Sequence, residues 1–137
     1  RLAAACIAAC PELDFAAIEG CTEKETAAVL RRSGLYLATS EGEQFGLPAL
    51  EAMAAGCAVV SVPVKGGMEY LHDGWNCAVA EPDTLPDTLK RVAQPENRAL
   101  RDTWRMRAAA VATRYRRGPH RRRVAARLAE GWKERLR

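Results

Sequence analysis

The sequence contains little that would support several large classes of function. It has two histidines and five cysteines, and the cysteines show no paired Cys-x-x-Cys spacing. This composition argues against a zinc site and against a disulfide framework, and it favours a reducing cytoplasm. Neither a signal peptide nor an apolar run long enough to cross a membrane is recognisable. We therefore expect a cytoplasmic protein without a zinc site, with its thiols packed as small apolar groups.

The charge is distributed unevenly along the chain. The 137 residues suffice for one domain with a real core, and the formal net charge is +4 at pH 7. Residues 1–97 contain 7 Lys and Arg against 14 Asp and Glu, a net charge of −7. Residues 98–137 contain 14 against 3, a net charge of +11. The sequence thus predicts an acidic body followed by a basic tail.

Strand and helix patterns alternate through the body. We expect, in chain order, a helix over Leu2–Cys10, a short buried strand over Phe15–Ile18, a helix from Glu23 to about Arg32, a buried strand over Gly34–Ala38, a helix from Pro48 to Gly56, a buried strand over Cys57–Val62, a last strand over Asn76–Ala80 and a helix carrying Leu85, Leu89, Val92 and Ala93. Such alternation indicates an α/β fold with a parallel, doubly wound sheet.

Two local signals concern helix starts. Thr22 and Glu25 have the spacing of a capping box, in which each side chain bonds the other residue's backbone N–H. Glu69 is expected to cap a short helix after the glycines Gly66 and Gly67. The loop that contains these glycines follows a strand, and open α/β sheets bind ligands at that end of their strands.

The rest of the chain is organised around residues 40–56, Ser-Glu-Gly-Glu-Gln-Phe-Gly-Leu-Pro-Ala-Leu-Glu-Ala-Met-Ala-Ala-Gly. A glycine-bearing loop here leads into a helix at Pro48, because proline suits the first helical turn, and Gly56 is the usual left-handed stop. Such a junction presents free backbone N–H groups and a partial positive charge of about half a unit. Its natural ligand is an anion, commonly a phosphate.

Two carboxylates frame this anion site. Glu43 lies in the loop and Glu51 is expected in the first turn of the helix. Carboxylates repel phosphate oxygens, so they are better suited to accepting hydrogen bonds from hydroxyl groups on either side of a phosphate. A ligand with hydroxyls on both sides of a diphosphate is a nucleotide sugar.

The stretch Glu43, seven residues, Glu51, within Phe45-Gly46-Leu47-Pro48 and Glu51-Ala52-Met53-Ala54, resembles the signature of a known family. That family is the retaining, nucleotide-sugar-dependent glycosyltransferases with a GT-B fold, the glycosyl transferases group 1. Gly66-Gly67-Met68-Glu69-Tyr70 and Asp73-Gly74-Trp75-Asn76 look like its next landmarks, and the resemblance runs from about Phe15 to Val92. It implies that residues 1–97 form a partial Rossmann-like, nucleotide-sugar-binding domain, one half of a GT-B fold.

The resemblance also implies roles for single residues. Glu43 matches the carboxylate that touches the hydroxyls of the donor sugar, which makes it the candidate catalytic residue. The N–H groups of Phe45, Gly46 and Leu47 match those lining the sugar and diphosphate, and Glu51 matches the residue that binds the ribose. The family transfers a sugar with retention and usually without a metal, so the resemblance implies that this chain needs no metal and no cofactor besides its nucleotide-sugar substrate. Positioning and charge stabilisation of the departing diphosphate then replace a protein nucleophile.

This chain departs from the family pattern in two ways. Gln44 stands where glycine is most common, and glycine allows the closest approach of backbone to ligand. No residue before Phe15 matches the Arg and Lys that clamp the diphosphate in the family. We therefore expect that more chain precedes Arg1, including the acceptor-binding domain, and that the isolated chain is inactive.

Residues 98–137 are predicted to form a basic tail of two helices packed on the body. One apolar stripe contains Leu100, Trp104, Ala108, Val111 and Tyr115, and the other contains Val124, Leu128, Trp132 and Leu136. Their arginine-rich faces are consistent with a solvated, packed tail, with an anionic membrane surface at the inner face, or, least well supported, with nucleic acid.

The sequence thus predicts the donor-binding part of a retaining glycosyltransferase that moves a hexose-like sugar from a nucleoside diphosphate to a hydroxyl acceptor. Two alternatives stay open at this point. One is a non-catalytic nucleotide-binding module, and the other is an adaptor for membranes or nucleic acid that acts through the basic tail.

Overall fold

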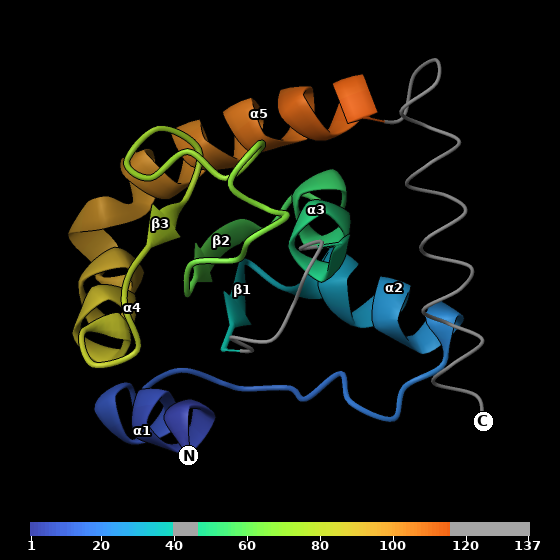
Figure 1. The fold of residues 1–137 in the computed structure, drawn as a ribbon. Helices are drawn as coiled ribbons and strands as arrows, with labels where there is room; N and C mark the ends of the chain where they lie inside the picture. Colours follow the sequence, from blue (N-terminus) through green and yellow to red (C-terminus); the bar gives the residue numbers. More distant parts are fainter. Residues whose placement is uncertain (40–46, 116–137) are drawn as a thin grey trace.

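The computed structural model describes residues 1–39 and 47–115. In chain order the elements are α1 (Leu2–Ala9), α2 (Glu23–Arg32), β1 (Leu35–Ala38), α3 (Leu47–Ala54), β2 (Ala58–Ser61), β3 (Ala78–Val79), α4 (Leu85–Ala93), a 3₁₀ turn (Pro95–Asn97) and α5 (Arg98–Tyr115). Figure 1 shows the strands at the centre with helices around them. The predicted α/β class is confirmed.

The sheet is parallel, with the strand order β1-β2-β3. Leu35 to Ala38 pair in register with Ala58 to Ser61, and Val60 pairs with Ala78. Because all three strands run the same way, their carboxyl ends share one edge, and the segments leaving β1 and β2 start there side by side. This edge is where a ligand site is expected.

Strand β2 forms the centre of the core, and all four of its residues are buried. Alternate side chains point to opposite faces of a sheet. Val59 joins a buried cluster with α3 and the second half of α5. Val60 joins a second cluster with Cys6 of α1, the apolar face of α4 and Trp104. Helices therefore cover both faces, as a doubly wound sheet requires.

The helix patterns of the sequence are largely confirmed. In α4 the predicted core positions Leu85, Leu89 and Val92 are buried. Helix α2 begins with the predicted capping box, in which the Glu25 N–H donates to the Thr22 hydroxyl at 3.2 Å and the Thr22 N–H donates to the Glu25 carboxylate at 3.3 Å.

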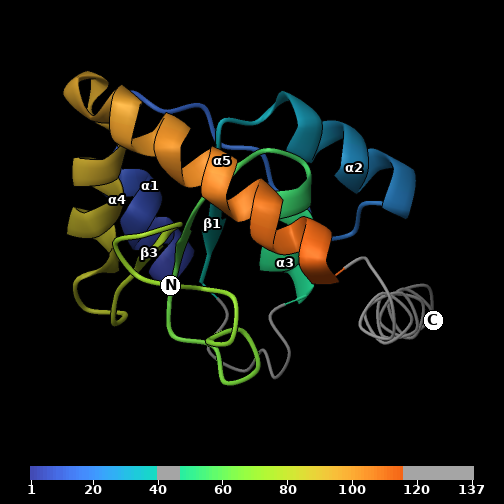
Figure 2. The same ribbon diagram turned by 90° about the horizontal axis from the view of Figure 1, so that it is seen from above.

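Helix α5 lies across the top of the molecule in Figure 1, and the view from above shows it crossing over the strands and α3 (Figure 2). Trp104, Ala108 and Val111 of its predicted stripe are buried, whereas Leu100 and Tyr115 at the ends are half-buried. The helix thus forms part of the core. The division of the chain at residues 97 and 98 into two parts stays a prediction.

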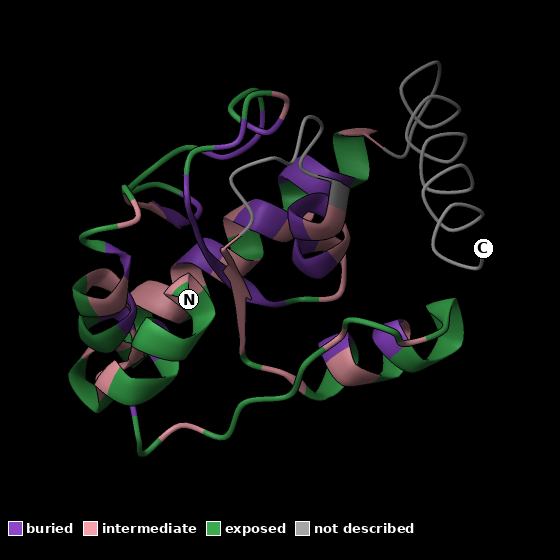
Figure 3. Cartoon of the chain, turned by 60° about the horizontal axis from the view of Figure 1, so that its bottom comes forward, coloured by how far each residue is buried: buried purple, intermediate pink, exposed green. Residues whose placement is uncertain are grey.

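The predicted strand at Phe15–Ile18 is wrong. Residues 11–22 form a connector between α1 and α2 without helix or strand, and most of it is exposed (Figure 3). Phe15 is 38% exposed. Alanine is a poor strand former, and two of the four residues are alanines, so the segment offers little apolar surface to bury in a sheet.

Strand β1 was predicted to be buried and is half-buried along its whole length. Within the described residues it pairs with β2 alone, so one of its edges carries no ladder. A strand at Phe15–Ile18 could have paired with this edge of β1. The described residues contain no strand there, so the edge has no neighbouring strand.

Candidate functional site

The candidate site is built around the amino end of α3, at the carboxyl edge of the sheet. Helix α3 starts at Leu47 with Pro48 as its second residue, and it runs back from the end of β1 to the start of β2. The carboxyl end of α3 is followed by Gly56 in the left-handed conformation, with a φ of +92°, as the sequence predicted. The N–H of Gly56 donates to Met53 and that of Cys57 to Ala52. Positive φ is a conformation that favours glycine.

The structure places two of the five predicted site residues. Glu43, Phe45 and Gly46 lie outside the described residues, whereas Leu47 opens α3 and Glu51 lies within it, half-buried. The sequence predicted Glu51 in the first turn of the helix, and the structure places it in the second. The helix begins one residue before Pro48, so Glu51 is its fifth residue and a turn takes 3.6.

The segment after β2, residues 62–77, leaves the same edge of the sheet. The N–H of Val62 donates to the Ala38 carbonyl at 3.1 Å, which extends the β1–β2 ladder by one bond. Lys65 beyond it is exposed. The loop after β1 and the loop after β2 therefore start from adjacent strands.

Residues 65–70 form a series of turns, so the short helix predicted at Glu69 is wrong. Gly67 is buried and accepts hydrogen bonds from the N–H groups of Tyr70 and Leu71 at 3.1 and 2.8 Å. A Cβ atom at Gly67 would lie 3.2 Å from Cδ1 of Leu71 and 3.3 Å from Cβ of Val64. A larger residue here would therefore need Leu71 or Val64 to move by a few tenths of an ångström.

The side chain of Asn76 hydrogen-bonds to the backbone of the preceding loop residues Tyr70 and His72. Its side chain is fully buried, donates to the Tyr70 carbonyl at 2.9 Å and accepts from the His72 N–H at 2.9 Å. Asp73 accepts from the Val79 N–H at 2.9 Å, and Gly74 has a φ of +80°. The predicted landmark Asp73-Gly74-Trp75-Asn76 thus has a structural role here, because it shapes the turn that leads into β3.

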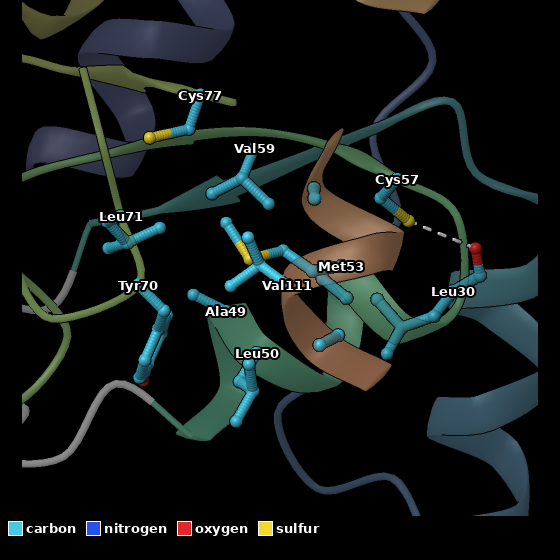
Figure 4. Close-up of a cluster of buried hydrophobic side chains, with 13 residues drawn as sticks. Leu30, Ala49, Leu50, Met53, Cys57, Val59, Tyr70, Leu71, Cys77 and Val111 are labelled. Carbon is cyan, nitrogen blue, oxygen red and sulfur yellow. Dashed lines mark hydrogen bonds between the residues drawn. The ribbon is translucent and has the colours of Figure 1, made fainter. Parts of the chain in front are cut away.

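A tyrosine pair connects this loop to the end of α5. The rings of Tyr70 and Tyr115 meet edge to face, with their centroids 5.3 Å apart. Tyr70 belongs to the same buried cluster as Ala49 and Leu50 of α3, and Figure 4 shows its ring beside these two residues. Burial, and secondarily a hydrogen bond to the carboxylate of Glu69, raise the pKa of Tyr115 to about 12.

The sequence offered a partial signal for this pair. Tyr115 is recognisable as the last residue of an apolar stripe, but no pattern indicates that it meets Glu69 and Tyr70, which lie more than forty residues earlier. Contacts of this kind depend on tertiary structure alone.

Three arginines of α5 hydrogen-bond to backbone carbonyls of other elements. Arg101 donates to the Val92 and Gln94 carbonyls at the end of α4, both at 2.7 Å. Arg105 donates to the Gly34 carbonyl at 2.9 Å, and Arg107 donates to the Trp75 carbonyl at 3.0 Å. These side chains fasten the helix to the body. The second predicted tail helix, with Arg121, Arg122 and Arg123, lies outside the described residues.

The cysteines are all free, and four of the five are buried. The thiol of Cys57 donates to the Leu30 carbonyl at 3.2 Å. Burial raises the pKa of Cys77 to about 12, with a further contribution from Asp73. The packing of Cys57 and Cys77 agrees with the prediction that these thiols are structural.

Two other searches of the described ranges, 1–39 and 47–115, gave negative results. No three His, Cys, Asp or Glu side chains there come together in a way that could hold a metal ion. None of the helices in these ranges combines the length and apolar character needed to cross a membrane.

Comparison with known proteins identifies the family. A sequence model described as "Glycosyl transferases group 1" matches residues 16–109, which is more than half of the chain. The chain belongs to the glycosyl transferases group 1 family. The matched range includes β1, β2, β3 and α3, together with most of α5. The predicted membership of the glycosyl transferases group 1 is thus confirmed, whereas the GT-B fold, the retaining reaction and the roles of residues 43–51 stay predictions.

A curated relative of this glycosyltransferase family is the alpha-1,6-glucosyltransferase of Actinobacillus pleuropneumoniae serotype 7 (strain AP76). It is 40% identical over 48 residues, which cover 35% of this chain and 14% of the relative. The similarity therefore spans a small part of that enzyme's length. No solved structure matches the chain.

Proposed function

We propose that this chain binds the nucleotide-sugar donor of a retaining glycosyltransferase. The observation that carries the proposal is the position of α3 within the family match. Its amino end, preceded by the Glu43-to-Leu47 motif, lies at the carboxyl edge of a parallel sheet. Open α/β sheets bind their ligands at that edge, and a helix amino end there favours a phosphate.

In this proposal each predicted residue has one task. Glu43 accepts hydrogen bonds from the donor sugar, and the N–H groups of Phe45, Gly46 and Leu47 line the sugar and diphosphate. Glu51, one turn further along α3, accepts from the ribose hydroxyls. Rise along a helix is about 1.5 Å per residue, so Glu51 is set back from the helix end, as the ribose is set back from the phosphates.

The proposed reaction is transfer of a hexose-like sugar to a hydroxyl acceptor with retention. Backbone N–H groups and the helix dipole stabilise the departing diphosphate, so the step needs neither a metal nor a protein nucleophile. The name of the relative, a glucosyltransferase, supports a hexose. The acceptor site belongs to a further domain of the GT-B type, and the 137-residue chain by itself is expected to transfer no sugar.

The proposal is tested by calorimetry and thermal shift on this chain with UDP, GDP, ADP and their sugars. One nucleotide should bind and raise the melting temperature, and Glu51→Ala should weaken that binding about tenfold or more, since it removes a charged hydrogen-bond acceptor. Asp87→Ala is the matched control, because Asp87 is an exposed carboxylate of α4, on the opposite face of the sheet. It should leave the affinity unchanged.

Each outcome has a clear meaning. Binding that Glu51→Ala weakens and Asp87→Ala does not supports the donor site. Equal affinity in wild type and Glu51→Ala, with both proteins folded, would contradict the role of Glu51. Failure of all three nucleotides and their sugars to bind the wild-type chain would contradict donor binding by this chain.

A further inference from the structure

The buried side of α1 is formed by two cysteines. Cys6 and Cys10, the residue that ends the helix, are both 0% exposed, whereas the other residues of α1 are exposed or half-buried. Helix α1 packs mainly against α4, as Figures 1 and 2 show. Both thiols belong to the buried cluster that contains Leu85 and Leu89 of α4. The two thiols therefore share one apolar layer of the protein.

The backbone holds these cysteines one helical turn apart. The N–H of Cys10 donates to the carbonyls of Cys6 and Ile7, both at 3.2 Å, and its own carbonyl accepts from the N–H of Leu13 at 3.1 Å. Residues four apart on a helix have Cβ atoms about 5–6 Å apart on the same face. Both thiols are free. Hydrogen bonds of the backbone therefore fix the spacing of the pair.

This spacing suits one metal ion between two sulfurs better than it suits a disulfide. A disulfide needs Cβ atoms about 3.5–4.5 Å apart, which is closer than one regular helical turn allows. Two metal–sulfur bonds of about 2.3 Å each connect sulfurs up to about 4.6 Å apart. Rotation about the χ1 angles of the two cysteines brings their sulfurs within that distance. An ion can thus bridge the pair without unwinding the helix.

The surroundings limit which ion fits. Within residues 1–39 and 47–115, no third His, Cys, Asp or Glu side chain completes a metal-binding group with these thiols. A structural zinc ion takes four ligands, and calcium and magnesium take oxygen ligands. The other members of the cluster are apolar side chains and Trp104. A soft monovalent ion such as Cu(I), which thiolates select and which accepts two sulfur ligands, fits both conditions.

The protonation of the cluster is consistent with such a site. Burial raises the pKa of both thiols, so the free protein keeps them protonated, and a coordinated metal ion removes the protons of its thiol ligands. Trp104 has a buried Nε1–H without a hydrogen-bond partner among the described residues. Such groups are rare in folded proteins. A thiolate is a stronger acceptor than a thiol, so metal binding adds an acceptor to a cluster that contains an unpaired donor.

From these observations we propose that Cys6 and Cys10 form a two-coordinate site for a soft monovalent metal ion of the Cu(I) type. Binding forms two metal–sulfur bonds across the last turn of α1 and releases two thiol protons, and no atom is oxidised. The ion enters when α1 shifts on α4, and a bare ion needs a smaller opening than an alkylating reagent. The site lies on the face of the sheet opposite α3, so the proposal does not depend on nucleotide binding.

The test measures Cu(I) binding to the 137-residue chain without oxygen, in competition with a coloured Cu(I) chelator. All samples contain Cys21→Ala, because Cys21 is the one cysteine that is not buried and would bind the ion by itself. We expect one Cu(I) per chain and a higher melting temperature with the ion bound. X-ray absorption at the copper edge should show two sulfur neighbours.

Three further variants locate the site. Cys6→Ala and Cys10→Ala should each lower the Cu(I) affinity about 100-fold or more, because losing even an outer hydrogen-bond partner of a metal ligand costs about 10- to 100-fold. The double variant should lose little more than either single one, since each change already breaks the pair. Cys77→Ala is the matched control. It removes another fully buried thiol, from the cluster on the other face of the sheet, and should leave the affinity unchanged.

The outcomes decide for or against the site. One Cu(I) with two sulfur neighbours, lost with either thiol and retained in Cys77→Ala, supports it. Unchanged affinity in a folded Cys6→Ala or Cys10→Ala chain overturns it, and so does an equal loss in Cys77→Ala. Three or four sulfur neighbours would mean an ion shared between chains and would also overturn it. The count of bound ions and the copper edge need no change at residues 6 and 10. Absence of bound Cu(I) therefore overturns the proposal even if the alanine variants do not fold.

Discussion

The guanidinium of Arg107 lies 5.1 Å from the centre of the Trp75 indole ring, and it also donates a hydrogen bond to the Trp75 backbone carbonyl at 3.0 Å. His72 meets the same indole edge to face at 6.1 Å. One side chain of α5 therefore fixes both the backbone and the side chain of the turn before β3.

Replacing Arg107 should loosen that turn. Arg107→Ala removes a cation–π contact and a charge-assisted hydrogen bond, and we expect the free energy of unfolding to fall by about 1–2 kcal/mol, measured in urea. Met106→Ala is the control, because Met106 is 69% exposed on the same helix and should change stability little. Equal effects of the two substitutions would contradict the contact's importance.

Asn76 is expected to be one of the most sensitive polar residues. Asn76→Ala leaves the His72 N–H and the Tyr70 carbonyl without their side-chain partner in a buried place, which should cost about 2–4 kcal/mol in unfolding free energy. Asn76→Asp retains the acceptor for His72 but brings a carboxylate to the Tyr70 carbonyl. It should therefore also destabilise. Asn97→Ala, which loses one exposed hydrogen bond, should cost much less.

Gly67 should not tolerate a side chain. In Gly67→Ala the added methyl group meets Leu71 and Val64 at distances shorter than ordinary contact, and overpacking of this kind costs about 1–3 kcal/mol. Gly56→Ala gives a comparison in which the new methyl group meets no atom within 4 Å and only the positive φ is strained. Leu71→Ala removes a buried side chain and is destabilising by itself. Combined with Gly67→Ala, it should give a total loss smaller than the sum of the two single losses, because the clash is relieved, whereas backbone strain at residue 67 would leave the losses additive.

The thiols should differ sharply in reactivity at mildly alkaline pH. Cys21 is half-buried and the other four cysteines are buried, so one thiol per chain should react quickly with an alkylating reagent and four only on unfolding. Mass mapping identifies the modified residue. Early modification of Cys77 would contradict its raised pKa.

The same thiol affects the stability of the protein in alkali. Because the folded-state pKa of Cys77 is raised from 9.0 to about 12, the unfolded chain loses this proton first as the pH rises. The contribution of the protonated Cys77 thiol to the free energy of unfolding is fully present below pH 9.0 and is lost as the pH rises through about 12. Unfolding free energy should therefore decline over that range, and less steeply in Cys77→Ala.

Local patterns in the sequence predicted local structure well. The capping box at Thr22, the left-handed Gly56 and the spacing of Leu85, Leu89 and Val92 all depend on residues within one or two turns, and all three predictions are confirmed. The strand at Phe15–Ile18 failed, because a strand depends on a partner that a short apolar run does not specify.

The site could be predicted less completely than the fold. The motif from Glu43 to Gly56 identified the family, which the match over residues 16–109 confirms. Glu51 was assigned one turn too early, because Pro48 is the second and not the first residue of α3. The contacts of Tyr115 and Arg105 join residues far apart in sequence, and no periodic pattern encodes them. The roles of Glu43, Phe45, Gly46, Leu47 and Glu51 toward a donor stay predictions.

The bond between Arg105 and Gly34 joins residues 71 positions apart. On the ribosome, β1 and β2 leave the exit tunnel well before α5 does, and at about 5–20 residues per second that interval lasts several seconds. During it the face of β2 that carries Val59 lacks the α5 part of its cover. Completion of the core therefore follows translation of α5, and a nascent chain stalled before Arg98 leaves that part of the face uncovered.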